Sequence, residues 1–181
     1  KGGKVVVDGS ISSQFITGLL IALPLAKEDT TLVVNDAVST PYIDMTLDTL
    51  ERFGVEIMHN EGDYTEFYIE GNQEFTPVDY TIESDWSAAS YWYLITALSK
   101  DAEITLPGLF KQSYQGDSKV GDFFPLLGAH TSYKENNVIL SKPNLIDISL
   151  ATHVNCDFTN QPDLVQTFVV ACVLQNTTFH F

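Results

Sequence analysis

The feature that most constrains the fold of this chain is an internal repeat with a period of about 74 residues. An apolar strand pattern, a polar turn and an apolar helix pattern follow one another three times, at Val5–Leu23, Tyr80–Leu98 and Asn155–Leu174. In the first two copies a second helix pattern follows and stops before a glycine, Gly54 or Gly128. We therefore expect the same supersecondary unit to be built two or three times.

Each full copy predicts the order strand, helix, strand, helix, strand, strand. Polar turns separate the last two strands, which indicates a hairpin in each copy. The predicted second helices and hairpin strands are Tyr42–Phe53, Ser118–Leu127, Val55–His59, Thr65–Glu70, His130–Lys134 and Val138–Ser141. The fold class is therefore α/β, made of repeated βαβαββ units. The segment Phe15–Ala26 is apolar nearly all round, so we expect this helix to be buried on most faces and to kink or end at Pro24.

The charge balance excludes some classes of partner. The 181 residues include 24 Asp and Glu but only 9 Lys and Arg, which gives a net charge of −15. Nucleic-acid binding is not expected, because a phosphate backbone needs a basic surface. A membrane span is not expected either, because no apolar run reaches about 18 residues.

The cysteine and histidine residues form no metal-binding pattern. Cys156 and Cys172 are isolated and have no CxxC spacing, which is typical of a reducing, cytoplasmic setting. The four histidines are scattered along the chain and match no zinc motif. No Gly-rich nucleotide-binding motif is present. We therefore expect no bound metal and no nucleotide.

The segment Gly9–Gln14 connects the first predicted strand to the first predicted helix. It reads Gly-Ser-Ile-Ser-Ser-Gln, so hydroxyls, an amide and free backbone N–H groups converge at the start of the helix. A helix N-terminus with such donors can bind a phosphate or a carboxylate. The alternative is that Ser12 or Ser13 only caps the helix. Few cations stand near this segment, so a bound phosphate ester would need positive charge from elsewhere.

The third copy of the repeat stops after its first helix and one further strand, Thr178–Phe181. The chain also begins directly before a strand, at Lys1 and without Met. We expect it to be an internal piece of a longer protein. The alternative is a natural protein whose last repeat is degenerate.

Five short segments carry a resemblance to a known family. They are Gly9–Phe15, Ser39–Asp44, Glu83–Tyr91, Gln115–Asp117 and Pro162–Asp163. In this order and spacing they resemble the 5-enolpyruvylshikimate-3-phosphate synthases (3-phosphoshikimate 1-carboxyvinyltransferases), over essentially the whole chain. The resemblance implies the enolpyruvyl transferase fold, of the inside-out α/β barrel type, in truncated form.

The resemblance also implies a division of the chain. Residues 1–82 would form the last repeat of one enolpyruvyl transferase domain. Residues 83–181 would form the first repeat and part of the second repeat of the other domain. In this family the active site lies between the two domains and closes on its ligands.

The implied reaction transfers the enolpyruvyl group of phosphoenolpyruvate to the 5-hydroxyl of shikimate 3-phosphate and releases phosphate, a step of aromatic amino-acid biosynthesis. No cofactor is implied. The implied partners are these two small molecules, with no nucleic acid or membrane, and the full-length enzyme is expected to be a monomer. The essential Lys and Arg residues of the family come from other segments, so we expect this chain alone to be inactive.

The resemblance assigns roles to five residues near the first two helices. Ser12, Ser13 and Ser39 would hold the 3-phosphate of the substrate. Gln14 would hydrogen-bond substrate oxygens near the reacting centre, since an amide can donate and accept. Tyr42 would lie against the same substrate, or alternatively pack on the sheet as an aromatic at a helix start.

The resemblance makes Asp163 the catalytic carboxylate, which accepts the proton of the 5-hydroxyl or orients that hydroxyl. Local sequence alone would instead favour an acid that stabilises the start of a helix after Pro162. Asp85 stands at the equivalent turn one repeat earlier, and we interpret it as a cap or hinge residue. Asp117 is expected to cap a helix at Ser118, with substrate contact as the alternative.

Two other functions remain open at this point. A related enolpyruvyl transferase acts on UDP-N-acetylglucosamine and shares the repeat architecture, but it lacks the Ser-Ser-Gln loop. A non-catalytic module could also use the helix start at Ser12 and Ser13 to sense an anion.

Overall fold

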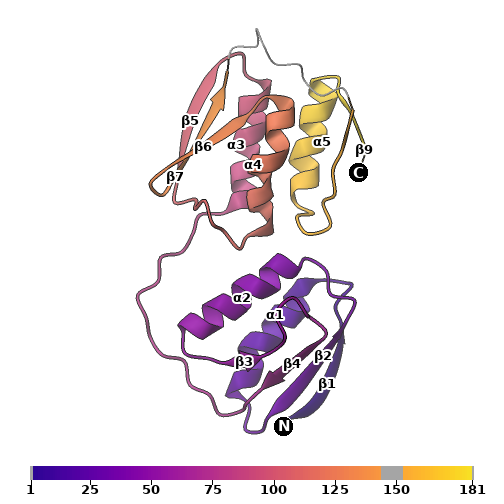
Figure 1. Ribbon diagram of the computed structural model, residues 1–181, viewed down its shortest axis with the longest axis vertical. Helices are drawn as coiled ribbons and strands as arrows, with labels where there is room; N and C mark the ends of the chain where they lie inside the picture. The colour runs from indigo at the N-terminus through magenta and orange to yellow at the C-terminus, as the bar shows by residue number, and fades with distance from the viewer. Residues whose placement is uncertain (1, 144–152, 181) are drawn as a thin grey trace. The chain divides into compact units, whose positions relative to one another are not determined.

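The computed structural model describes residues 2–143 and 153–180. The chain divides into two compact units, Lys1–Thr81 and Ile82–Phe181 (Figure 1). Each unit has its own hydrophobic core. The assignment of residues 1–82 and 83–181 to repeats of two enolpyruvyl transferase domains stays a prediction.

The first unit has the predicted βαβαββ order. Its elements are β1 (Gly3–Asp8), α1 (Ser13–Ala22), the 3₁₀ turn η1 (Leu23–Leu25), β2 (Thr30–Asn35), α2 (Thr40–Arg52), β3 (Ile57–Met58) and β4 (Glu66–Ile69). The sheet order is β1-β2-β4-β3, with β1 and β2 parallel and the other pairs antiparallel. β2 is rich in Thr and Val, and alternate residues are buried, as expected for a central strand with one face on a core.

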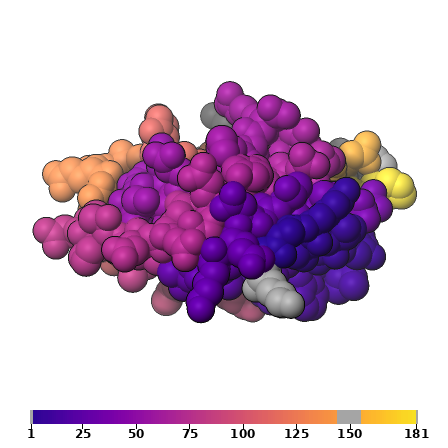
Figure 2. Space-filling model, turned by 90° about the horizontal axis from the view of Figure 1, so that it is seen from below, coloured from indigo at the N-terminus to yellow at the C-terminus, as the bar shows by residue number. Residues whose placement is uncertain are grey.

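The first helix confirms one expectation and corrects another. The α-helix ends at Ala22, and Pro24 stands in the 3₁₀ turn that follows, because proline cannot supply the N–H that the next turn needs. The helix is not buried on most faces: Phe15 is 56% exposed and Ile21 is 50% exposed. The sheet and α2 cover one side of α1 only. In the space-filling view the N-terminal segment of the chain, drawn in indigo, lies at the surface (Figure 2).

The second unit repeats most of this order. Its elements are α3 (Trp86–Leu98), β5 (Ala102–Pro107), the 3₁₀ turn η2 (Gly116–Lys119), α4 (Val120–Phe123), the 3₁₀ turn η3 (Phe124–Leu127), β6 (His130–Lys134), β7 (Asn137–Lys142), β8 (His153–Asn155), α5 (Leu164–Leu174) and β9 (Thr178–His180). The three-stranded sheet has the order β5-β7-β6, which matches β2-β4-β3 of the first unit. β8 and β9 pair in parallel, as β1 and β2 do.

Two predicted elements of the second unit differ from the structure. The strand expected at Tyr80–Ile82 is not formed, so β5 has no parallel neighbour there. The helix expected over Ser118–Leu127 is split between η2, α4 and η3. Pro125 lies in the first turn of η3 and lacks the N–H for a continuous α-helix.

One backbone hydrogen bond recurs at the same point of all three copies. In the first and third copies the residue after the first strand donates its N–H to the last residue of the second strand, and in the second copy Ser84 donates to the residue that follows β5. The three pairs, which we call the strand-edge hydrogen bonds, are Gly9 N to Asn35 O (2.7 Å), Ser84 N to Gly108 O (2.8 Å) and Cys156 N to His180 O (3.0 Å). The second copy makes this bond although its first strand is missing. The repeat read from the sequence is therefore also a repeat of backbone geometry.

The second core contains a group of packed aromatic rings. Phe124 and Phe168 meet edge to face at 5.5 Å, and Tyr93 lies 5.6 Å from Phe124. Trp86 is fully buried at the start of α3. In the part of the chain that the structure describes, no helix has the length and apolar character needed to cross a membrane.

A buried lysine joins the ends of two helices in this unit. Lys142 is 5% exposed, and its Nζ donates to Ala97 O at 2.6 Å and to Leu127 O at 3.3 Å. Gln175 Nε2 donates to the same two carbonyls, at 2.8 and 3.0 Å. These carbonyls lie in the last turns of α3 and η3, where a positive charge is favourable. Burial lowers the pKa of Lys142.

We predict that Lys142→Met lowers the free energy of unfolding by about 1–2 kcal/mol, because the two buried carbonyls lose a charged donor. Lys119→Met is the matched control, because its ion pair with Asp122 is exposed and should contribute less than about 0.5 kcal/mol. Both tryptophans lie in the second unit, so urea unfolding followed by tryptophan fluorescence reports on it. Equal stability of the two variants would mean that Gln175 alone satisfies both carbonyls.

Candidate functional site

The first unit brings the starts of α1 and α2 to one edge of its sheet. β1 and β2 are parallel and in register to their last residues, Asp8 and Asn35, so both following loops leave at the same edge. The loops are in contact: a Cβ on Gly9 would lie 2.8 Å from a methyl of Val34 and 3.0 Å from the Cα of Ala37. The two helices that begin there pack against each other. Ligands commonly bind at this edge in α/β sheets.

Ser12, Ser13 and Gln14 form the start of α1. Ser12 is the N-cap, and its Oγ accepts a hydrogen bond from the N–H of Gln14 at 3.2 Å. The capping role of Ser12 is thus confirmed. In this role the hydroxyl oxygen of Ser12 accepts a hydrogen bond, so the hydroxyl proton of Ser12 can still be donated to a ligand. Ser13 is 7% exposed, whereas the side chain of Gln14 is exposed.

The loop before α2 holds two residues with a left-handed backbone. Asp36 and Ser39 both have φ of 52°. This conformation costs a non-glycine residue of the order of 1 kcal/mol and occurs in ordinary turns, as at Asn72 and Glu135, as well as at ligand-binding sites. Ser39 is the N-cap of α2 but makes no side-chain capping hydrogen bond, and it is half-buried. No local pattern in the sequence predicts these two backbone angles.

Tyr42 stands in the first turn of α2 and is half-buried. Its backbone N–H donates to Ser39 O at 3.1 Å, so its position is tied to that of the loop. The structure therefore brings all five residues predicted in the first unit to the same edge of the sheet. Contact of the Tyr42 ring with substrate stays a prediction.

The charged side chains of the two loops at this edge are carboxylates, those of Asp8 and Asp36, and the loops contain no Lys or Arg. Asp8, at the end of β1, accepts hydrogen bonds from the N–H and the Oγ of Ser10, at 2.9 and 2.6 Å, and these bonds lower the pKa of Asp8. The ion pairs of the described residues, Arg52 with Asp48 and Lys119 with Asp122, do not involve the predicted site. Neutral donors therefore dominate the edge, as the sequence indicated.

The three first helices of the repeat begin at Ser12, Asp85 and Asp163, and the three caps differ chemically. Asp85 accepts a hydrogen bond from the N–H of Ser87 at 2.8 Å, which confirms that it is a cap. Asp163 has a helical backbone, makes no side-chain capping hydrogen bond and is exposed. Its carboxylate is therefore not used to hold the start of α5. Asp163 belongs to the second unit.

The expectation for Asp117 was wrong. Asp117 does not cap a helix at Ser118: it lies within η2, whose N-cap is Gln115, and it is fully buried. Its carboxylate accepts a hydrogen bond from Ser87 Oγ of α3. Asp117 thus ties η2 to α3, a role that depends on packing and could not be read from the local sequence.

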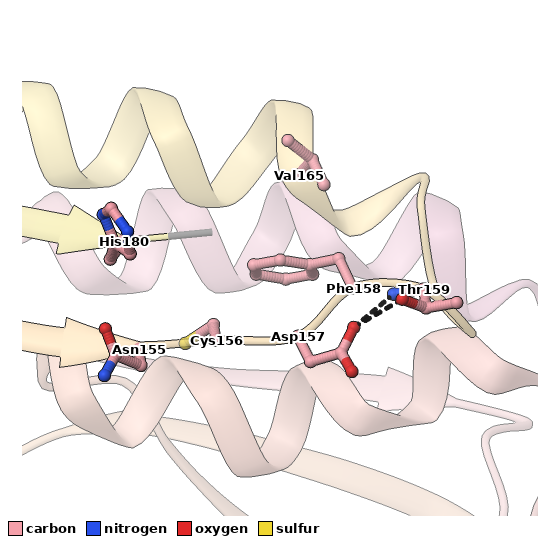
Figure 3. Close-up of a pocket in the computed structure, with 7 residues that line it drawn as sticks. All are labelled: Asn155, Cys156, Asp157, Phe158, Thr159, Val165 and His180. Atoms are coloured by element: carbon pink, nitrogen blue, oxygen red, sulfur yellow. Dashed lines mark hydrogen bonds between the residues drawn. The ribbon is translucent and has the colours of Figure 1, made fainter.

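The second unit also holds a pocket of about 500 Å³. Its lining residues come from β8, the loop that follows, α5 and β9; they are Asn155, Cys156, Asp157, Phe158, Thr159, Val165 and His180 (Figure 3). Asp157 accepts hydrogen bonds from Thr159, drawn as dashed lines in Figure 3. None of the residues predicted to bind substrate lines this pocket.

Comparison with known proteins gives a consistent result over the whole chain. A family model described as EPSP synthase (3-phosphoshikimate 1-carboxyvinyltransferase) matches residues 1–180. The 3-phosphoshikimate 1-carboxyvinyltransferase of Bacteroides fragilis is 40% identical over 181 residues, which cover 99% of this chain and 42% of the relative. That of Methanococcus aeolicus is 35% identical and covers 98% of this chain and 41% of the relative. The chain thus spans about two fifths of the length of these relatives.

Solved structures match at the level of the fold. An EPSP synthase from Acinetobacter baumannii superposes with a TM-score of 0.65 at 17% identity, over 95% of this chain and 38% of that one. The enolpyruvyl transferase NikO from Streptomyces tendae gives a TM-score of 0.54 at 16% identity, over 93% of this chain and 42% of that one. The predicted enolpyruvyl transferase fold, present in part, is confirmed.

The different caps of α3 and α5 lead to a prediction. Asp85→Ala should lower the free energy of unfolding by about 1 kcal/mol, because a capping hydrogen bond is lost. Asp163→Ala should change it by less than about 0.5 kcal/mol, because no such bond exists. Urea unfolding followed by circular dichroism measures both, and each variant serves as the control for the other. If Asp163→Ala lowered the free energy of unfolding as much as Asp85→Ala does, this would contradict the assignment of Asp85 as a cap and Asp163 as a residue that caps no helix.

Proposed function

The chain belongs to the EPSP synthase family, and on that premise we propose that it supplies part of the active site of a 3-phosphoshikimate 1-carboxyvinyltransferase. The proposed reaction transfers the enolpyruvyl group of phosphoenolpyruvate to the 5-hydroxyl of shikimate 3-phosphate. The methylene carbon of phosphoenolpyruvate takes up a proton, while the 5-hydroxyl gives up its proton and its oxygen attacks the neighbouring carbon. The tetrahedral intermediate then loses phosphate together with a proton from the new methyl group, which restores the double bond. The site must therefore clamp anions and supply a proton donor and a proton acceptor.

The observation that carries the proposal is the meeting of two helix starts at one sheet edge. Ser12 and Ser13 begin α1, and Ser39 begins α2 beside them. We propose that these three residues bind the 3-phosphate of shikimate 3-phosphate. Hydroxyl and backbone N–H donors with helix dipoles behind them suit a phosphate. The left-handed backbone at Ser39 is consistent with a loop shaped for a ligand.

The remaining roles follow from the chemistry of the side chains. Gln14 is exposed beside the two serines, where its amide can hydrogen-bond the substrate hydroxyls. Tyr42 is proposed to lie against the carbon ring of the same substrate. Asp163 is proposed to accept the proton of the 5-hydroxyl, since its carboxylate is exposed and not used for capping.

The proposed substrate site lacks positive charge within this chain. The chain carries 9 Lys and Arg in all, and neutral donors dominate the edge at α1 and α2. We propose that Lys and Arg residues of the remaining three fifths of the enzyme complete the clamps for both phosphate groups. The cytoplasmic setting expected from two free thiols, Cys156 and Cys172, belongs to the same proposal.

We predict that shikimate 3-phosphate, titrated into this chain, shifts the amide NMR signals of Ser12, Ser13, Gln14 and Ser39. Ser13→Ala should abolish these shifts, because it removes a hydroxyl from the phosphate site. Ser10→Ala is the matched control in the same loop, because its hydroxyl is bonded to Asp8. Equal shifts in both variants would contradict the proposed site.

We also predict that the chain alone has no transferase activity, because catalysis needs the charged residues of the rest of the enzyme. The measurement is phosphate release from shikimate 3-phosphate and phosphoenolpyruvate together, compared with the rate without protein. Release above that rate, lost in Asp163→Asn, would show that the chain is sufficient for the reaction.

A further inference from the structure

Glu83 lies at the beginning of the second unit and is surrounded by hydrogen-bond donors. Its Oε1 accepts from Trp86 Nε1 at 2.7 Å and from the N–H of Phe110 at 2.9 Å. Its Oε2 accepts from Ser113 Oγ at 2.7 Å and from Gln115 Nε2 at 3.1 Å. Two donors on each oxygen are typical of the way proteins bind an ionised carboxylate.

A second layer holds one of these donors in place. The Oε1 of Gln115 accepts the N–H of Trp86 at 2.9 Å, and its Nε2 also donates to Ser84 O at 2.9 Å. Gln115 therefore connects the start of α3 to the segment before η2. All four donors to Glu83 are neutral, and neither ion pair of the described residues includes Glu83.

The position of Glu83 in the repeat is informative. Glu83 comes directly before Ser84, and Asp8 comes directly before Gly9; both Ser84 and Gly9 donate strand-edge hydrogen bonds. Glu83 and Asp8 are therefore equivalent residues of the repeat. Asp8 is shorter by one methylene group and accepts its hydrogen bonds from Ser10 in its own loop.

The donors around Glu83 come from the same stretches of the repeat as the proposed phosphate site of the first unit, although the donor groups differ. Phe110 and Ser113 lie in the segment between β5 and η2, as the loop 36–39 lies between β2 and α2. Gln115 is the N-cap of η2, and Ser39 is the N-cap of α2. The carboxylate of Glu83 thus binds a side chain from the first turn of α3 and groups from the segment before η2, as the phosphate proposed in the first unit would bind groups at the starts of α1 and α2.

We propose that Glu83 is a built-in ligand: its carboxylate occupies, in the second unit, the anion-binding position of the repeat. Removal of this side chain then leaves a site for a small carboxylate such as formate, made of neutral donors. The comparison with the first unit rests on the proposed function, whereas the donor cluster does not. The ligand class follows from the group already bound there, a planar anion with two oxygens.

The test is a titration of Glu83→Ala with sodium formate, followed by the indole N–H signal of Trp86. The variant should lose the hydrogen-bonded position of this signal, and formate should restore it. Wild-type protein should respond at least about tenfold more weakly, because its own carboxylate fills the site. Sodium chloride at the same ionic strength, and the signal of Trp92 within the same spectra, control for salt effects.

Glu83→Gln is the matched variant. Its side chain fills the same space, but its NH₂ group cannot accept from Ser113 or Gln115. It should therefore respond to formate no more than the wild type does. A response of Glu83→Gln equal to that of Glu83→Ala would overturn the proposal, because it would show binding outside the position of the carboxylate.

The outcomes are separable from those for the first unit. If Glu83→Ala is folded and formate does not move the Trp86 signal, the inference fails. If Glu83→Ala unfolds, the same titration measures refolding. Recovery of dispersed amide signals with formate but not with chloride would support the proposal for Glu83. No recovery with formate would overturn it. The amide NMR shifts that shikimate 3-phosphate causes at Ser12 and Ser39 report only on the proposed function. The proposed function and the proposal for Glu83 can therefore fail independently.

Discussion

The strand-edge hydrogen bond is the constraint on which the rest of each repeat depends. It joins the residue after the first strand to the end of the second, for example Gly9 N to Asn35 O at 2.7 Å. Where both strands are formed, this bond holds their ends side by side, so the two loops leave and the two following helices begin at the same edge. The helix starts then face one edge of the sheet, where unpaired N–H groups can bind an anion. The second copy keeps this bond without its first strand, which indicates that the loop geometry is the essential part.

The first helix of each copy begins at the same point of the repeat, but the residue before it differs in its chemistry. The first helices begin at Ser12, Asp85 and Asp163, and only the first of these caps is uncharged. An acidic cap satisfies a helix dipole but repels an external anion, whereas a serine cap leaves the dipole available to one. The first copy is therefore the one suited to bind a phosphate. Asp85 uses its carboxylate for capping, whereas Asp163 keeps its carboxylate exposed, so two similar turns leave the same group bonded in one case and accessible in the other.

The sequence allowed the repeat, the helices and the hairpins to be predicted, because hydrophobic periodicity and polar turns are local signals. The errors have tertiary causes. Tyr80 packs on Phe53 of the first unit, 5.9 Å between rings, so an apolar strand pattern at 80–82 gives no strand. Phe15 lies in an apolar helix expected to be buried on most faces but is 56% exposed, since the sheet and α2 of the first unit cover the other side of α1. For the site, residue types identified Ser12 and Ser39 as candidates, whereas the backbone of Asp36 and the roles of Asp117 and Glu83 depend on distant partners that no local pattern reveals.

The charge of the chain sets the limits of what these sites can do. With a net charge of −15, the protein repels anions at long range, so any anion site must act at hydrogen-bonding distance. Glu83 illustrates the solution: four neutral donors hold a carboxylate that is covalently attached and has no entropy of association to lose. A free phosphate ester would lose that entropy and would bind such donors weakly. Neutral donors at Ser12 and Ser39 are therefore suited to orient a substrate, whereas tight binding requires cations from the rest of the enzyme.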